Sequence, residues 1–185
     1  MHTYSRHLLL TGALVVIIMA PAAARGQAAL EPIKVTDAQM RAAQLDREAA
    51  EYEQTDWGKL RKAAALREEA AELRTADDPK AVVSLYWAAR DRYYSDDKVV
   101  GRKLMEQSAD RAIAIGDVVG AATAYTEAAY IAAELRDVYR TRLFANKAKL
   151  LALSPMLTND QRMQLRTRLA GETLFTGLLA FAERP

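Results

Sequence analysis

The segment Gly116–Leu135, with the sequence GDVVGAATAYTEAAYIAAEL, decides the fold of this 185-residue chain. After its opening Gly-Asp pair it carries only two charged residues, Glu127 and Glu134, and its apolar residues cover nearly every side of a helix. A helix without a polar face is stable in water only when neighbouring elements cover it on several sides. We therefore expect residues 118–135 to form the buried centre of a helical stack, in which the many alanines let neighbouring backbones approach closely.

Signals that start helices recur on both sides of this segment in two interleaved sets. Serine, threonine and aspartate cap the free amides at helix N-termini. Each set repeats about every 41 residues, and a helix-pair period of this size is typical of a stacked α-solenoid. One set is Thr36-Asp37, Asp77-Asp78-Pro79, Gly116-Asp117 and Thr158-Asn159, and the other is Thr55-Asp56, Ser95-Asp96-Asp97 and Arg136-Asp137.

These signals predict an all-α domain of about seven to eight helices, built of antiparallel hairpins that stack as a short α-solenoid. Capping boxes start helices at Thr36 and Thr158, where a glutamine follows three residues later. A second helix is expected to run from Thr55 to about Leu73. Gly116 is expected to end a helix in the left-handed conformation.

Residues 1–28 have the pattern of a cleaved signal peptide. Arg6 and His7 precede a twelve-residue apolar core, and small residues lead to a cleavage site after Ala24 or Ala28. The core is shorter than the roughly 20 residues that span a bilayer, so an uncleaved anchor is the less favoured alternative and no membrane span is expected after cleavage. Because the chain has no cysteine, a lipoprotein signal is excluded. We expect a periplasmic or secreted bacterial protein.

The remaining chain is expected to contain a linker and one helical-repeat domain. We place the linker at residues 29–35 and the domain at residues 36–185. Within that domain, residues 36–75 are densely charged and are predicted to form an N-terminal capping hairpin, with an apolar stripe at Met40, Ala43, Leu45 and Ala50. An antiparallel coiled coil is the alternative for this hairpin.

Composition excludes several kinds of chemistry. The only histidines, His2 and His7, lie in the signal peptide, so the mature chain has neither histidine nor cysteine. Zinc sites of the His or Cys type, cysteine nucleophiles and Ser-His-Asp triads are therefore excluded. We expect no cofactor, no metal and no enzymatic activity. The formal charge of +2 falls to zero when Arg6 and Arg25 are removed, which argues against nucleic-acid binding.

Charge is nevertheless uneven along the chain. Residues 31–97 have a balance of −4 and residues 98–185 a balance of +4. In an elongated stack this distribution favours head-to-tail association or a partner that meets one end, whereas solvated helix faces are the simpler alternative. Paired carboxylates suggest a glycan- or murein-acting envelope enzyme as an alternative function, although helix capping also explains the aspartates. These pairs are Glu68-Glu69, Asp77-Asp78 and Asp96-Asp97.

Residues Met105–Ala133 resemble a tetratricopeptide repeat. With Gly116-Asp117 as the turn, large and small residues fall where that family places them. They are Met105, Ser108, Ala109 and Ala112 on the first helix and Ala121, Tyr125 and Ala128 on the second. Ser108 replaces the usual leucine and Ala133 the final proline, and the period of about 41 residues exceeds the family's 34. The resemblance implies a helical-repeat architecture and a role in protein–protein contact.

The densest aromatic cluster lies at residues 86–94. Trp87, Arg90 and Tyr94 have the spacing i, i+3 and i+7, so one helix face places a guanidinium between two rings. This arrangement suits a peptide or carboxylate, and we predict a partner-binding surface there. The alternative is that Tyr86 and Trp87 belong to the core and Arg90 covers them.

The last third of the chain supplies two further candidate surfaces. One is basic, with Arg140, Arg162 and Arg166 as candidate partner contacts for anionic lipid, peptidoglycan carboxylates or an acidic protein, against the alternative of a solvated face. The other is a C-terminal apolar helix at residues 171–185, which packs as a lid or forms a homodimer contact. Its apolar residues are Leu174, Phe175, Leu178 and Phe181. The sequence as a whole predicts a scaffold or adaptor that binds a protein or peptide in the cell envelope. A carboxylate-based envelope enzyme and a structural coiled-coil protein are the alternatives.

Overall fold

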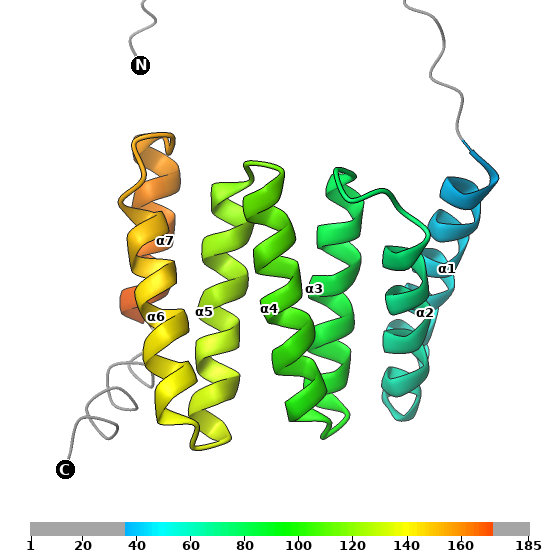
Figure 1. Ribbon diagram of the computed structural model, residues 1–185. Helices are drawn as coiled ribbons and strands as arrows, with labels where there is room; N and C mark the ends of the chain where they lie inside the picture. The colour runs from blue at the N-terminus through cyan, green and yellow to red at the C-terminus, as the bar shows by residue number, and fades with distance from the viewer. Residues whose placement is uncertain (1–35, 172–185) are drawn as a thin grey trace, which may run out of the picture. The chain divides into compact units, whose positions relative to one another are not determined.

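The computed structural model describes residues 36–171, and these residues form a single stack of helices that follow one another in chain order (Figure 1). Each helix packs against the next, and the described residues contain no strand, which confirms the predicted short all-α solenoid. The elements are α1 (Asp37–Thr55), η1 (Trp57–Lys59), α2 (Leu60–Glu72), α3 (Pro79–Tyr94), α4 (Lys98–Ala114), α5 (Val118–Glu134), α6 (Val138–Ala152) and α7 (Asn159–Gly171).

Several predictions fall outside this range. The signal peptide at residues 1–28, the linker at residues 29–35 and the apolar residues Leu174 to Phe181 lie outside the described residues. Gly171, where the predicted C-terminal apolar helix starts, is the last residue of α7. None of the helices between residues 36 and 171 combines the length and the apolarity that crossing a membrane requires.

Three turns of one kind join α3, α4, α5 and α6. Each turn has a residue in the left-handed conformation, with φ of 65° at Asp96, 78° at Gly116 and 57° at Arg136. The amide of the following aspartate then donates to a carbonyl oxygen five residues earlier, at 2.8 to 2.9 Å, which closes a Schellman motif. The prediction for Gly116 is therefore confirmed. The turns are 20 residues apart, so the repeating unit is one helix with its turn, and two units give the period seen in the sequence.

The repeat brings small residues to the helix contacts. Gly101 in α4 lies so close to α3 that an added Cβ would be 2.8 Å from the carbonyl oxygen of Ala89. Ala121 in α5 and Thr141 in α6 occupy the equivalent positions, 20 and 40 residues later, and both are buried. Small side chains at this position let the helices pack with their backbones close together.

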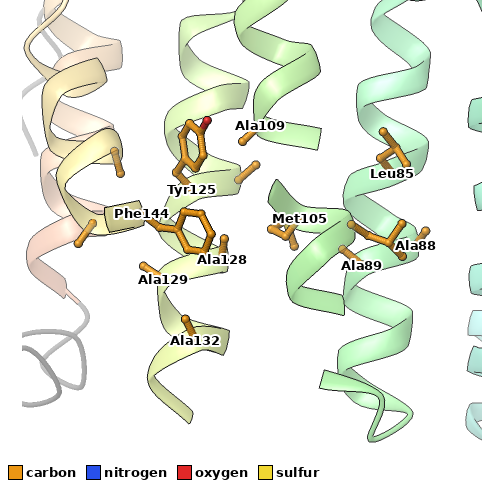
Figure 2. Packing of buried hydrophobic residues seen from close by; sticks show 14 of the residues in the cluster. Leu85, Ala88, Ala89, Met105, Ala109, Tyr125, Ala128, Ala129, Ala132 and Phe144 are labelled. Carbon is orange, nitrogen blue, oxygen red and sulfur yellow. The ribbon is translucent and has the colours of Figure 1, made fainter. Parts of the chain in front are cut away.

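Helix α5 is the centre of the stack, as predicted. No residue from Val118 to Leu135 is exposed, and α5 contacts α3 and α7 as well as its neighbours α4 and α6. On the α6 side, the ring of Tyr125 stacks against Phe144 with 6.0 Å between centroids (Figure 2). Met105 lies on the α4 side of the same cluster. The core thus consists of many alanines with a few large side chains between them.

The seven residues that resemble a tetratricopeptide repeat are all buried. Ser108, which stands where the family has leucine, donates a hydrogen bond of 2.9 Å to the carbonyl oxygen of Val82 in α3. The buried hydroxyl is therefore satisfied. Helices α3 to α6 are 15 to 17 residues long and their turns have three residues, which explains a longer period than 34. Membership of that family remains a prediction.

The first hairpin differs from the prediction in two details. Thr55 is the last residue of α1, and α2 begins at Leu60, because the Asp56 carboxylate accepts the amide of Gly58 at 2.9 Å and starts a short 3-10 turn instead. Met40 is 53% exposed and lies outside the buried stripe of α1, which shares only one residue with the predicted stripe. Its members are Ala42, Leu45 and Ala49.

Candidate functional site

Helix α3 carries a row of exposed aromatic side chains with an arginine between them. The Cζ atom of Arg90 lies 4.9 Å from the ring centroid of Trp87 and 5.6 Å from that of Tyr94. This is the geometry that the spacing of the three residues predicts. Trp87 is 36% exposed, so the alternative that placed it in the core is wrong for this residue, whereas Tyr86 is half-buried against the core.

A tryptophan from a different element extends this row. Trp57 lies in η1, is 72% exposed, and packs edge-on against Tyr94 with 6.1 Å between ring centroids. The sequence does not predict this contact, because Trp57 and Tyr94 belong to different elements. The only signal in the sequence for this contact is that an aromatic residue directly follows the Thr55-Asp56 pair between two helices.

A hollow of about 330 Å³ opens beside the row, between α3 and α5. Its floor consists of Met105 and Ile131, which are buried, and three tyrosine rings line it. Arg90 from α3 and Glu127 from α5 also line it. We call the row and the hollow together the aromatic groove. Its members are Trp57, Trp87, Arg90, Tyr93, Tyr94, Met105, Glu127, Tyr130 and Ile131.

A hydrogen-bonded cluster holds one part of the groove in place. The Tyr93 hydroxyl donates to Oε1 of Glu134 at 3.0 Å, and Lys98 Nζ lies 3.1 Å from Oε2 of the same carboxylate. The ring of Tyr93 packs against Tyr94 and Tyr130 with centroid distances of 5.0 and 6.2 Å. Burial, together with hydrogen bonds to Tyr130 and Glu134, raises the pKa of Tyr93 above its ordinary value. Tyr93 is therefore a neutral donor at physiological pH.

The hollow is lined by one positive and one negative side chain, which can bind the carbonyl oxygens and the amides of a peptide backbone. Arg90 donates to the Tyr94 hydroxyl at 3.4 Å and has further donors for carbonyl oxygens, and Glu127 lines the same hollow and interacts electrostatically with Arg90. An extended peptide presents amide donors and carbonyl acceptors in alternation. The groove therefore offers an apolar floor for one side chain and polar partners for the backbone on either side of it.

Close to Trp87 lies a cluster of buried charges from three helices, which we call the buried charge cluster. Arg67 of α2 forms an ion pair with Glu53 of α1, its Nε is 3.6 Å from Oδ2 of Asp91 of α3, and its guanidinium lies 5.4 Å from the Trp87 centroid. The Arg67 and Asp91 side chains are 8% and 5% exposed. Burial, and then the neighbouring charge of Glu53, raise the pKa of Asp91 to about 7, although Arg67 opposes the shift.

The predicted basic residues do not gather into one patch. Arg140 lies in the first turn of α6, is exposed, and binds Asp137 at 2.7 Å. Arg162 lies in the first turn of α7 and donates to the carbonyl oxygens of Ser154 and Leu157 at 3.3 and 3.4 Å, so it holds the connection between α6 and α7. Arg166 is exposed one turn later. Because α6 and α7 are antiparallel, Arg140 lies at the opposite end of the pair from Arg162 (Figure 1).

The carboxylates adjacent in sequence are engaged with neighbouring groups. Asp78 accepts from the amide of Lys80 at 2.8 Å and caps α3, and Asp97 is the N-cap residue of α4. Glu68 lines a second hollow of about 650 Å³ between α2 and α4, where Arg92 binds it at 2.8 Å. Between α4 and α6, the Tyr125 hydroxyl donates to Asp110 and accepts from Lys147 Nζ at 3.0 Å.

No matching family or solved structure guides the interpretation of these features. Comparison with protein-family models, with curated proteins and with solved structures found no match to this chain. Within residues 36–171, no group of three or more acidic, histidine or cysteine side chains is placed to hold a metal ion. The groove must therefore be interpreted from its own chemistry.

Proposed function

We propose that this protein is an interaction scaffold whose aromatic groove binds an extended segment of a partner protein. The observation that carries this proposal is the exposed row of Trp57, Tyr94, Arg90 and Trp87 beside a hollow with an apolar floor. Tryptophan, tyrosine and arginine are the side chains that most often dominate binding energy at protein interfaces. Exposed together on one face, they mark a surface suited to a partner rather than to solvent.

The chemistry of the groove suggests which segment it binds. A volume of about 330 Å³ lies at the lower end of ligand-site sizes, which fits one large apolar side chain or a proline ring. Arg90 donates to a backbone carbonyl oxygen of the segment and Glu127 accepts from a backbone amide. Because these two charges cancel, the segment itself needs no net charge. Aromatic faces also suit polyproline-type backbone, which loses little entropy on binding.

The proposal includes export to the bacterial cell envelope, because residues 1–28 have the pattern of a signal peptide. The tetratricopeptide-like stretch Met105–Ala133 supports the same role, since it implies protein–protein contact. Helix α4, from which Met105 contributes to the floor of the groove, lies within that stretch.

A displayed library of random ten-residue peptides, selected on the purified protein, tests the proposal. We expect Tyr94→Ala to weaken the selected peptides at least about tenfold in fluorescence anisotropy, because a central aromatic contact contributes about 1.4 kcal/mol or more. The matched control is Tyr139→Ala, which removes a tyrosine that is 74% exposed on α6, outside the groove. Equal loss in the two variants, or no loss in Tyr94→Ala, would contradict the proposal.

A further inference from the structure

We propose that the buried charge cluster of Glu53, Arg67 and Asp91 makes the aromatic groove responsive to pH: one shared proton holds α1 and Trp57 against α3, and loss of that proton releases them. This inference rests on the proposed function, because it describes the regulation of the same groove. It concerns residues from three helices that are far apart in sequence and meet around one guanidinium.

The buried charge cluster holds more carboxylates than cations. Two carboxylates face one guanidinium, and the exposed fractions of the Glu53, Arg67 and Asp91 side chains are 24%, 8% and 5%. Arg67 Nε and Asp91 Oδ2 are 3.6 Å apart, and neither atom has a hydrogen-bond partner among the described residues. An unpaired negative charge in such surroundings is costly. One proton removes that charge and supplies a donor between the two carboxyl groups.

Charged groups from three helices surround Asp91. The charges that face it are Glu53 from α1, Arg67 from α2 and Arg90 from its own helix. Helix α4 presents Gly101 to α3 at Ala89 and Tyr93 and adds no charge to this set. Burial, the first cause, and Glu53, the second, raise the pKa of Asp91 to about 7, so the proton is bound below neutral pH and lost above it.

The buried charge cluster is connected to both ends of the aromatic row. Glu53 lies in the last turn of α1, and Trp57 follows it by one helical turn and packs on Tyr94. Arg67 lies against the ring of Trp87 at 5.4 Å. The cluster therefore contacts Trp87 at one end of the aromatic row. It also binds α1, the helix that precedes Trp57 at the other end. When the proton leaves, repulsion between Glu53 and Asp91 separates α1 from α3 and moves Trp57 away from Tyr94.

The effect on stability has a definite sign. Because the pKa of Asp91 is higher in the folded protein than its ordinary value of about 3.9, the folded state binds this proton more tightly than the unfolded chain. The contribution to stability is greatest at low pH, declines as the pH rises from about 4 to about 7, and changes no further above that. Residues 36–171 contain no histidine, the side chain that ordinarily titrates between pH 5 and pH 8, so a transition near pH 7 points to Asp91.

Acrylamide quenching of tryptophan fluorescence tests the inference without any partner. The chain has two tryptophans, so Trp87→Phe leaves Trp57 as the only reporter. We expect quenching of Trp57 to rise with pH, with a midpoint near 7. In the same background, Asp91→Asn should hold quenching at its low-pH value throughout, because the amide is neutral and can donate to Glu53. The control, Glu51→Gln, replaces an exposed carboxylate of α1 and should keep the transition.

Thermal unfolding of the chain with both tryptophans gives a second measurement. Asp91→Asn should raise the melting temperature most at pH 8 and by roughly half as much at pH 5.5, because about half of the parent's proton-linked stability is still present at pH 5.5. A transition that persists in Asp91→Asn, no transition in the parent, or an equal loss of stability at both pH values would overturn the inference. Peptide binding is measured separately at pH 6. Failure of binding with an intact Trp57 transition would reject the proposed function alone, and the reverse result would reject the pH response alone.

Discussion

The two ends of the described stack join their helices by different means. From α3 to α6, the contacts consist of small residues such as Gly101, which recur every 20 residues beside turns of one kind. Between α1, α2 and α3, arginines with little exposure bind carboxylates on other helices. Arg74 is the clearest case, with a side chain that is 3% exposed, 2.5 Å from Asp46 of α1 and 2.5 Å from the Ser84 hydroxyl of α3. Contacts between small residues allow close packing at any pH, whereas the ionic contacts select particular partners and depend on protonation.

The difference also changes the meaning of the charge count. The N-terminal half has a surplus of acidic residues in the sequence, which favours an acidic end to the stack. In the structure, Asp46, Glu53 and Asp91 are bound to Arg67 or Arg74 inside the helix contacts. These three carboxylates therefore help to join α1 to α3, and they do not add to the exposed charge of this end.

Among these variants, Phe144→Ala should cause the largest loss of stability, through the apolar contacts from α3 to α6. Phe144 is fully buried and stacks on Tyr125, so its truncation removes apolar contacts and leaves a cavity. We expect a loss of about 3–5 kcal/mol in the free energy of unfolding, measured by urea denaturation. Leu150→Ala on the same helix removes a side chain that is 70% exposed and should cost far less. Equal costs would show that α6 is not packed as described.

Arg74→Met should cause a somewhat smaller loss of stability, through the ionic contacts between α1, α2 and α3. Removing a fully buried partner typically costs about 3–5 kcal/mol, but the Asp46 side chain is 29% exposed, so we expect about 2–3 kcal/mol. Adding Asp46→Asn to this variant should restore part of the stability, because the carboxylate left without its partner is then neutral. If the double variant is less stable than Arg74→Met, the ion pair does not account for the contact.

Gly101→Ala and Gly116→Ala compare a closely packed position with a turn position of the repeat, and we expect the smallest losses of stability for them. At Gly101 the new Cβ meets backbone at 2.8 Å, and we expect a net loss of roughly 1–2 kcal/mol after the gain in helix propensity. At Gly116 the space is open but φ is 78°, so we expect about 1 kcal/mol, and less for Gly116→Asn. Thermal denaturation measures all three. A stabilising Gly101→Ala would contradict the close approach of α3 and α4.

Much of the fold is predictable because helix starts and stops are local. Capping by Thr36, Asp78 and Thr158 and the left-handed Gly116 depend on residues within one turn, and the structure has them where the sequence places them. The predicted start of α2 at Thr55 was wrong, because Thr55 and Asp56 are equally good caps. The Asp56 carboxylate forms a 3-10 turn with Gly58, and this competes with a regular helix start.

The candidate site divides in the same way. The position of Arg90 between Trp87 and Tyr94 follows from helical spacing on one element. Trp57 and Glu53 could not be connected to α3 from the sequence, because they come from other helices and no periodic pattern links them. For the basic residues, the sequence shows a shared sign of charge, and only the structure places Arg140 and Arg162 at opposite ends of a helix pair. Their role as partner contacts stays a prediction.

By itself the sequence determined the helices, their turns, their order and the buried centre at α5, because these depend on interactions within a few residues and on apolar periodicity. The tertiary structure alone decided which charges are buried, which aromatic rings form the groove, and where Asp91 meets Glu53. Burial and pairing of side chains depend on the surface that another helix supplies, and this surface exists only after the helices have packed.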